Sequence, residues 1–155
     1  MCPSWIAMLA GRHADPPTQR GQMPVPVPVT LLYGGLNALL ITLLGMQVSR
    51  SRGVHGVGVD TPIPKEMMRT VRAHGNATEW VPLGLVLLLA IELSGAGTRF
   101  TLHLAGGTLL LGRVLHAAGL YGRNKLSAVG AALPYLVLMG MSVWAIAIRF
   151  IQYGP

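Results

Sequence analysis

The sequence predicts an all-α fold, an integral membrane bundle of four transmembrane helices in a single domain. Of the 155 residues, 52% are hydrophobic and only 11% are charged, whereas soluble domains carry about 25% charged residues. A stretch of about 20 apolar residues, at about 1.5 Å per residue, crosses a hydrocarbon core of about 30 Å. Four such stretches are present, at about residues 29–48, 69–93, 100–121 and 127–151.

The first stretch follows three prolines, Pro24, Pro26 and Pro28, which suit an extended entry and cannot continue a helix backwards. Its most polar interior residue is Asn37, which we expect to hydrogen-bond to a neighbouring helix. Residues 49–68 are rich in glycine, proline and charge and are predicted to form the main loop.

The second stretch, residues 69–93, is polar in its first half and almost wholly apolar from residue 81 onwards. A short turn at residues 94–97 joins it to the third stretch. Residues 1–22 are predicted to be a disordered tail or a start-site artefact with Met23 as the true beginning. The membrane domain is then expected to span residues 23–155.

The net charge of +7 does not indicate nucleic acid as a partner. The basic residues lie in the segments between the apolar stretches and do not form one basic surface stripe. Such flanking cations orient membrane proteins with the positive loops in the cytoplasm. The two loops on one side are flanked by six of them: Arg50, Arg52, Lys65, Arg69, Arg123 and Lys125. We therefore expect membrane lipids as the surroundings, with loops 49–68 and 122–126 cytoplasmic.

No metal site is expected, because the chain has a single cysteine, Cys2, and its histidines lack partners at metal-ligand spacing. Any thiol chemistry must therefore use a bound thiol.

Four polar residues at the start of the second stretch fall within an arc of about 80° on a helix repeating every 3.6 residues. They are Arg69, Arg72, Asn76 and Glu79. Near the end of the third stretch, Arg113 and His116 lie about 60° apart. Because the two stretches run in opposite directions, both polar sets are expected at the same membrane depth, where they can converge.

A charged side chain at the centre of a membrane helix costs about 2.5 to 3.5 kcal/mol on insertion scales, so pairing or function is expected. Glu79 and Arg113 are the natural ion pair. That pair leaves Arg72, Asn76 and His116 unexplained. The residues alone leave three interpretations open: a site for a small zwitterionic anion such as glutathione, a structural polar core, and a transport pathway.

The segments RAHGNATEWVPL, residues 72–83, and GRVLHAAGL, residues 112–120, resemble the two signature segments of the MAPEG family. This family comprises membrane-associated proteins in eicosanoid and glutathione metabolism, and the similarity is to its bacterial branch. The loop residues 58–60 that precede Arg69 are also similar to bacterial members. The resemblance covers about residues 29–150.

The resemblance implies a four-helix protomer that assembles as a homotrimer and binds glutathione between subunits near the cytoplasmic face of the bacterial inner membrane. Glutathione would be the co-substrate, with no metal, of a transferase or peroxidase that acts on lipophilic small molecules. The residues that match the family's glutathione contacts are Arg72, Asn76, Glu79, Arg113 and His116. Arg69, on the same helical face, completes the predicted ligand-binding set.

Two departures from the family pattern concern activation of the thiol. Eukaryotic members have a tyrosine where this chain has Leu120, and Tyr121 points about 100° away from it. They also have an arginine at the start of the fourth helix, whereas residues 126–130, the opening turns of that helix in this chain, contain no cation. Arg123 and Lys125 are the candidates for a catalytic, thiolate-stabilising role.

These departures favour an alternative, a non-catalytic membrane protein that retains only a structural polar core. A small multidrug exporter ranks last, because it would need a membrane glutamate in the first stretch, which has no charge.

The charge asymmetry predicts the orientation of the chain. A reporter that is active only in the cytoplasm, fused after Pro155, should give no signal, because the C-terminus is expected outside. A fusion within the predicted loop, residues 49–68, serves as the positive control. Strong cytoplasmic signal from the Pro155 fusion would contradict this orientation.

Overall fold

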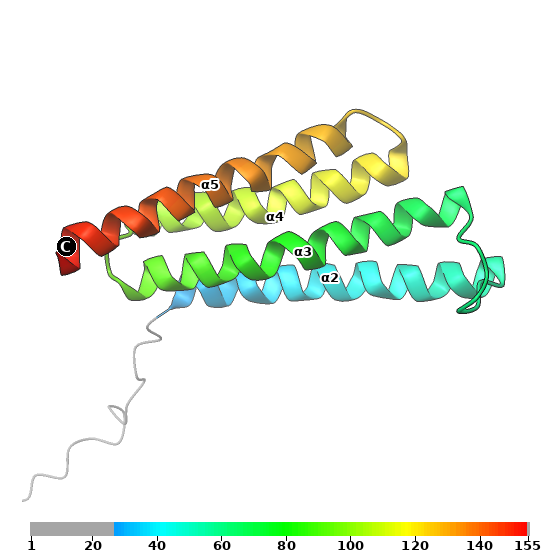
Figure 1. The fold of residues 1–155 in the computed structure, drawn as a ribbon, viewed down its shortest axis with the longest axis horizontal. Helices are drawn as coiled ribbons and strands as arrows, with labels where there is room; N and C mark the ends of the chain where they lie inside the picture. Colours follow the sequence, from blue (N-terminus) through cyan, green and yellow to red (C-terminus); the bar gives the residue numbers. More distant parts are fainter. Residues whose placement is uncertain (1–26, 155) are drawn as a thin grey trace, which may run out of the picture.

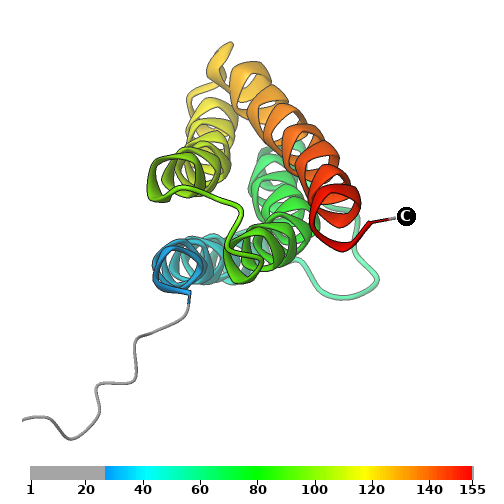
Figure 2. The ribbon, with the colours of Figure 1, turned by 90° about the vertical axis from the view of Figure 1, so that its left-hand side faces the viewer.

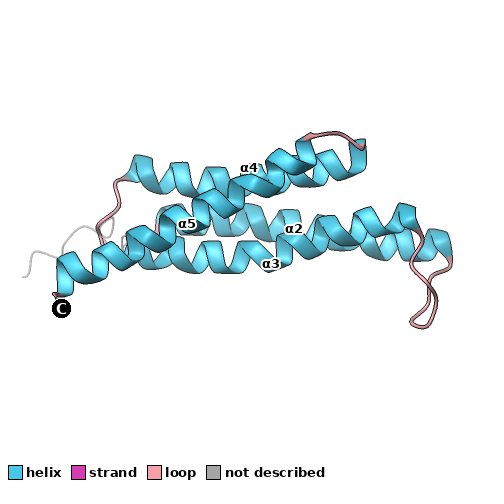
Figure 3. Cartoon of the chain, turned by 45° about the horizontal axis from the view of Figure 1, so that its top comes forward, coloured by secondary structure: helices cyan, strands magenta, loops and turns pink. Residues whose placement is uncertain are grey.

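The computed structural model describes residues 27–154, which form four helices, α2 (Pro28–His55), α3 (Lys65–Leu93), α4 (Arg99–Gly122) and α5 (Leu126–Tyr153). Successive helices run in opposite directions, and the described residues contain no strand (Figure 1, Figure 3). The predicted all-α four-helix bundle is confirmed. The predicted tail, residues 1–22, lies outside the described residues.

The helices are longer than the apolar stretches, so the predicted loop at residues 49–68 is wrong in its bounds. Helix α2 continues to His55, and α3 already begins at Lys65, which leaves residues 56–64 as the loop. Helix α2 ends at Gly56, whose left-handed backbone (φ 61°) lets its N–H bond the carbonyls of Arg52 and Gly53. Hydropathy indicates where the chain leaves the membrane, but it does not indicate where a helix ends. The polar turns of α2 and α3 can remain helical in water, so both helices extend beyond the apolar stretches.

The start of α2 is held by an acid from the far end of α3. The first residue, Pro28, has no N–H, and the N-cap Val27 has no side chain that could accept a hydrogen bond. The carboxylate of Glu92 accepts the next two N–H groups, from Val29 at 2.9 Å and Thr30 at 2.7 Å. A negative charge at a helix N-terminus also interacts favourably with the helix dipole.

Helices α4 and α5 make the most extensive contact of any helix pair among residues 27–154. Figure 2 shows that they converge towards the turn that joins them and diverge towards the opposite end. A Cβ atom on Gly119 would lie 2.0 Å from the backbone nitrogen of Ser127, and one on Gly130 would lie 2.1 Å from that of His116. Close approach therefore requires glycine on both helices, as membrane helix pairs often do.

The outer surface is apolar, as expected of a protein surrounded by lipid. Leucine, valine and methionine side chains are exposed along the outside of the bundle, Leu39, Met139 and Val143 among them. Among the described residues, α2, α3 and α5 are long and apolar enough to cross a membrane. Helix α4, which carries Arg113, His103 and His116, is not among these three. The chain is an integral membrane protein.

The cap on α2 generates a testable prediction. Replacing Glu92 with alanine should lower the free energy of unfolding in detergent by about 1 to 2 kcal/mol, because two N–H groups of the first turn lose their acceptor. Thermal unfolding of the purified protein measures the loss. Glu66→Ala, which removes an exposed acid from the first turn of α3, is the control. Equal loss in the two variants would contradict the capping role.

Candidate functional site

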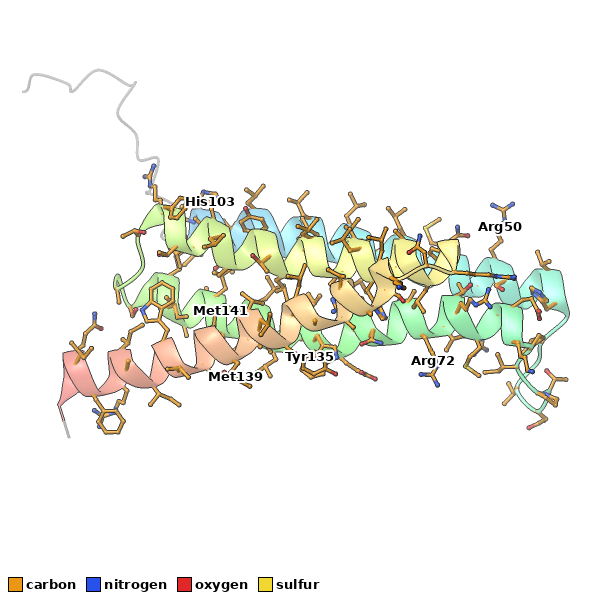
Figure 4. The ribbon with its side chains drawn as sticks, turned by 90° about the horizontal axis from the view of Figure 1, so that it is seen from above. Arg50, Arg72, His103, Tyr135, Met139 and Met141 are labelled. Atoms are coloured by element: carbon orange, nitrogen blue, oxygen red, sulfur yellow. The ribbon has the colours of Figure 1, made fainter. Side chains whose placement is uncertain are left out.

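The four polar residues of the α3 arc lie on the side of the helix that turns away from the bundle core. The opposite side of α3 is buried: Met67, Thr70, Ala73, Ala77, Val81, Gly84, Leu88 and Ile91. Arg72 and Glu79 are exposed, and Arg69 and Asn76 are half-buried. Figure 4 shows Arg72 pointing outwards. We call Arg69, Arg72, Asn76 and Glu79 the α3 polar stripe.

No hydrogen bond to another described residue involves the side chains of Arg69, Arg72 or Glu79 within residues 27–154. Their polar groups therefore remain available on the outside of a helix whose other neighbours on the surface, such as Leu83 and Val86, are apolar. Unpaired charges beside apolar surface are costly in a membrane unless a ligand or a further protein surface meets them.

Arg113 is buried, with only 2% of its surface exposed, and its guanidinium joins three helices. From α4 it donates to the main-chain carbonyl of Asn76 in α3 at 3.1 Å and to that of Gly130 in α5 at 2.9 Å. The Gly130 carbonyl is free because the residue four positions later is Pro134, which has no N–H to complete the helical hydrogen bond. Proline in α5 thus creates the acceptor that a buried cation in α4 uses.

The predicted ion pair between Glu79 and Arg113 is wrong. Both hydrogen bonds of Arg113 are made to main-chain carbonyls, and Glu79 lies exposed on the outer face of α3. The two polar sets do share one depth, since Arg113 reaches the backbone of Asn76. Their side chains do not converge within one protomer, because the α3 stripe points outwards and Arg113 points inwards.

His116, one turn after Arg113, is also buried and faces α5. Its Nδ1 lies 2.8 Å from the carbonyl oxygen of Ser127 and, because a carbonyl only accepts, this nitrogen carries the proton. The Nε2 atom of His116 and the Nε atom of Arg113 are buried without a hydrogen-bond partner among the described residues. A narrow polar region therefore lies between α4 and α5.

An aromatic pair joins α3 to α5 on the same side as the stripe. The rings of Trp80 and Tyr135 meet edge to face, with centroids 4.3 Å apart. Figure 4 shows Tyr135 and Arg72 pointing towards the same side of the bundle. Trp80 thus has the packing role that its amphipathic ring suggests.

The two candidates for thiolate stabilisation lie in the short turn between α4 and α5. Arg123 ends α4 in a left-handed conformation (φ 55°) that is uncommon for a residue other than glycine. Lys125 is the N-cap residue of α5. Both side chains are exposed at the end of the bundle that also carries the 56–64 loop (Figure 1).

The structure defines the contacts of two other polar residues within the spans, Asn37 and His74. Asn37 does not bond a neighbouring helix as expected, because its amide donates to the Tyr33 carbonyl of its own helix at 2.8 Å. His74 packs against α2, and a Cβ on Gly45 would lie 3.2 Å from its ring. No cluster of metal-ligating side chains occurs among the described residues.

Sequence reasoning missed the parts of the site that are main chain, namely the carbonyls of Asn76, Ser127 and Gly130. One signal could have revealed the last of these. A proline within a predicted transmembrane helix frees the carbonyl four residues earlier. A buried arginine on a neighbouring helix is the natural donor to that carbonyl.

Comparison with known proteins supports the resemblance. The sequence matches the MAPEG family over residues 30–147. It is 34% identical over 119 residues to the inner membrane protein YecN of Escherichia coli K12, and the alignment covers 73% of this chain and 90% of YecN. YecN of Escherichia coli O6:H1 gives the same values. The matched range contains the whole α3 polar stripe as well as Arg113 and His116.

The partners of Arg113 can be tested with a double-mutant cycle. Arg113→Leu should lower the free energy of unfolding by about 2 to 4 kcal/mol, because two buried carbonyls lose a charged donor. Pro134→Ala restores an N–H for the Gly130 carbonyl, so in that background the loss should shrink by about 1 kcal/mol. Glu79→Gln is the control and should add to Arg113→Leu without coupling. Coupling to Glu79 in place of Pro134 would contradict this arrangement.

Proposed function

Because this chain belongs to the MAPEG family, we propose that it binds glutathione at the α3 polar stripe and transfers it to lipophilic electrophiles, or uses it to reduce lipophilic peroxides. The single observation that carries the proposal is the exposure of Arg72 and Glu79, unpaired within the described chain, on the surface of a membrane-spanning helix. Charges held there cost stability, and a ligand of complementary charge offsets that cost.

The charge pattern of the stripe matches glutathione. The tripeptide carries two carboxylates and one ammonium group. Arg69 and Arg72 supply guanidinium groups that can hold carboxylates through two parallel hydrogen bonds. Glu79, about two turns beyond Arg72 on the same face, supplies a carboxylate for the ammonium group, and the Asn76 amide lies between them.

A second copy of the chain would complete the site, since the stripe is open on the side away from the bundle core. We propose a homotrimer in which glutathione lies between subunits. The apolar side chains that flank the stripe, Leu83 and Val86, are exposed in a single protomer. Their burial against a neighbouring subunit would exclude lipid from the polar groups, while the lipophilic substrate would approach from the membrane.

The transfer step would use the glutathione thiolate as the nucleophile. Its sulfur forms a bond to an electrophilic carbon of the substrate, the bonding electrons of the leaving group depart with it, and the thiol proton goes to solvent. A cation near the sulfur lowers the pKa of the thiol. Arg123 and Lys125 are proposed for this role, since they lie at the same end of the bundle as the stripe.

A second candidate function is glutathione binding without catalysis, or a purely structural polar core. Two observations favour it. Leu120 has no group that could act on a thiol, and the hydrogen bonds of Arg113 and His116 go to main-chain carbonyls. Absorbance of the bound thiolate separates the two functions, because a mere binder holds glutathione as the thiol.

Localisation follows from the same reasoning. We propose that the protein resides in a bacterial inner membrane, with the 56–64 loop and the Arg123–Lys125 turn in the cytoplasm, where glutathione is present. The cations around these two connections support this orientation.

Glutathione should raise the melting temperature of the purified protein, since a ligand that binds only the folded state stabilises it by about 2.7 kcal/mol at 100 times its dissociation constant. Arg72→Leu should abolish most of that rise and leave the protomer folded, because Arg72 is exposed and its side chain makes no hydrogen bond among residues 27–154. Arg52→Leu, which removes an exposed cation from the end of α2, should respond like the unaltered protein. A flat response of the unaltered protein to glutathione would refute the proposed function.

A further inference from the structure

A second polar site lies at the end of the bundle where α2 and α4 begin. It is a cavity of about 160 Å³ lined by Pro28 and Val29 of α2 and by Arg99 and His103 of α4. We call this cavity the Arg99 pocket. Figure 4 shows His103 at the opposite end of the bundle from Arg50. The apolar stretches of the sequence begin at this level, so the pocket opens where a membrane has its headgroups.

The Arg99 pocket differs in depth from the α3 polar stripe. Arg72 of the stripe and Glu92 near the pocket are separated by about five and a half turns of α3, which is about 30 Å along the helix axis. Subunits of a cyclic trimer that cross the membrane in the same direction meet at equal depths. A neighbouring subunit therefore cannot bring its stripe to this pocket, whichever faces of the protomers meet.

Two hydrogen-bond donors line the pocket on α4. Arg99 and His103 are four residues apart and are therefore neighbours on the helix surface. The Arg99 side chain is exposed and makes no hydrogen bond within residues 27–154, so its five N–H donors are available to a ligand. The start of α4 also presents the positive end of its helix dipole. This set of donors suits an oxyanion such as a phosphate group.

The imidazole of His103 is held in place by α2. Its Nδ1 lies 3.3 Å from the hydroxyl oxygen of Tyr33, and the two rings meet edge to face with centroids 5.7 Å apart. The Tyr33 ring in turn fills the space that a Cβ on Gly106 would occupy. With the phenol donating to Nδ1, the proton of the neutral imidazole is on Nε2, and this nitrogen can donate to an anion.

An acid adjoins the same pocket. The two carboxylate oxygens of Glu92 accept the N–H groups of Val29, a lining residue, and of Thr30. Glu92 is the only acid at this end of the described chain, and His103 is close enough to interact with its charge. Each carboxylate oxygen has a second lone pair, so Glu92 can accept a further donor. The pocket therefore combines donors for an anion with an acceptor for a cation.

The surface beside the pocket, towards the middle of the membrane, is apolar. Leu32 and Leu36 lie one and two turns further along α2, on the part of its face between Pro28 and Val29, and both are exposed. They offer a track for an acyl chain. The cavity is smaller than the about 300 to 1,000 Å³ that encloses drug-sized ligands, so it has room for a headgroup and not for a whole lipid.

We propose that the Arg99 pocket binds the headgroup of a phospholipid that carries both a phosphate and a primary ammonium group, as phosphatidylethanolamine does. Arg99 and His103 donate to the phosphate, and the Glu92 carboxylate accepts from the ammonium group. An anionic headgroup without an ammonium group leaves Glu92 beside a negative charge, and a quaternary ammonium has no N–H to donate. In the predicted orientation this lipid belongs to the outer leaflet.

Thermal unfolding of the full chain in a non-ionic detergent tests the proposal, since a ligand of the folded state raises the melting temperature. Phosphatidylethanolamine, phosphatidylcholine and phosphatidylglycerol are titrated separately at about 0.15 M salt, where long-range attraction between charges is screened. Phosphatidylethanolamine should bind at least about tenfold more tightly than the other two, the effect of one charge-assisted hydrogen bond. Equal affinity for all three lipids, or tighter binding of phosphatidylglycerol, contradicts the proposal. So does the absence of saturable stabilisation, the result expected if a neighbouring subunit fills the pocket.

Matched variants locate the site. Arg99→Gln should weaken the binding of phosphatidylethanolamine at least about tenfold. Arg149→Gln removes the other exposed cation at the same end of the bundle, outside the pocket, and should leave the affinity unchanged. Equal weakening by these two variants would overturn the proposal. His103→Phe keeps an aromatic ring and removes the second donor, so it should also weaken binding.

Glu92→Gln tests the contact with the ammonium group. It removes the negative charge, so the preference for phosphatidylethanolamine over phosphatidylglycerol should largely disappear. This ratio of affinities is measured within one variant, so the weaker cap on α2 does not affect the comparison. An unchanged ratio would rule out the ammonium contact and with it the proposal. Glutathione titrations should be the same in Arg99→Gln and the unaltered protein, so this proposal can fail independently of the proposed function.

Discussion

Arg113 holds together the loop-side half of the bundle, because its guanidinium joins α3, α4 and α5 at one depth. No water is available in hydrocarbon to solvate a cation or a free carbonyl, so each must find a partner within the protein. The acceptor in α5 exists because Pro134 cannot donate to Gly130, and Gly130 also lets α4 approach closely enough for Arg113 to reach it. An arginine, a proline and a glycine on two helices therefore act as one structural unit, and no member can be understood alone.

This unit limits where ligand chemistry can occur. The guanidinium of Arg113 donates to main-chain carbonyls, and Nδ1 of His116 donates to a different carbonyl of α5, that of Ser127, so neither faces the outside of the bundle. The polar groups that remain available are those of α3, which points Arg72 and Glu79 outwards. A ligand held there would contact α3 directly, while Arg113 would act on it only through the backbone that carries Asn76. Within this protomer the α4 residues of the resemblance therefore bond the main chain of neighbouring helices, whereas Arg72 and Glu79 of α3 face outwards.

The sequence was sufficient to predict the helices, their number and the face of α3 that carries the polar stripe, because hydropathy and helical periodicity are local properties. It was insufficient for the hydrogen-bond partners, which depend on how the helices pack. Pairing Glu79 with Arg113 assumed that opposite charges at one depth must meet, but two main-chain carbonyls, that of Asn76 and that of Gly130, which Pro134 frees, accept the hydrogen bonds of Arg113 instead. Asn37 likewise bonds within its own helix. In the sequence, nothing distinguishes Glu92 from the other four acids. Only the packing of α3 against α2 shows that its carboxylate caps the start of α2.

The two ends of the bundle differ in how their charged side chains are paired. At the end with the 94–98 turn, the Glu92 carboxylate is satisfied by two N–H groups, Tyr33 lies against Gly106 with its ring edge towards His103, and the second half of α3 is apolar. At the other end, Arg72 and Glu79 stand exposed on the outer face of α3. Sequences depart from consistent local rules chiefly at functional sites, where stability is given up. A bundle in which the acid at one end is hydrogen-bonded can carry exposed charges at the other. The exposed charges of α3 accordingly lie in its first half, near the 56–64 loop.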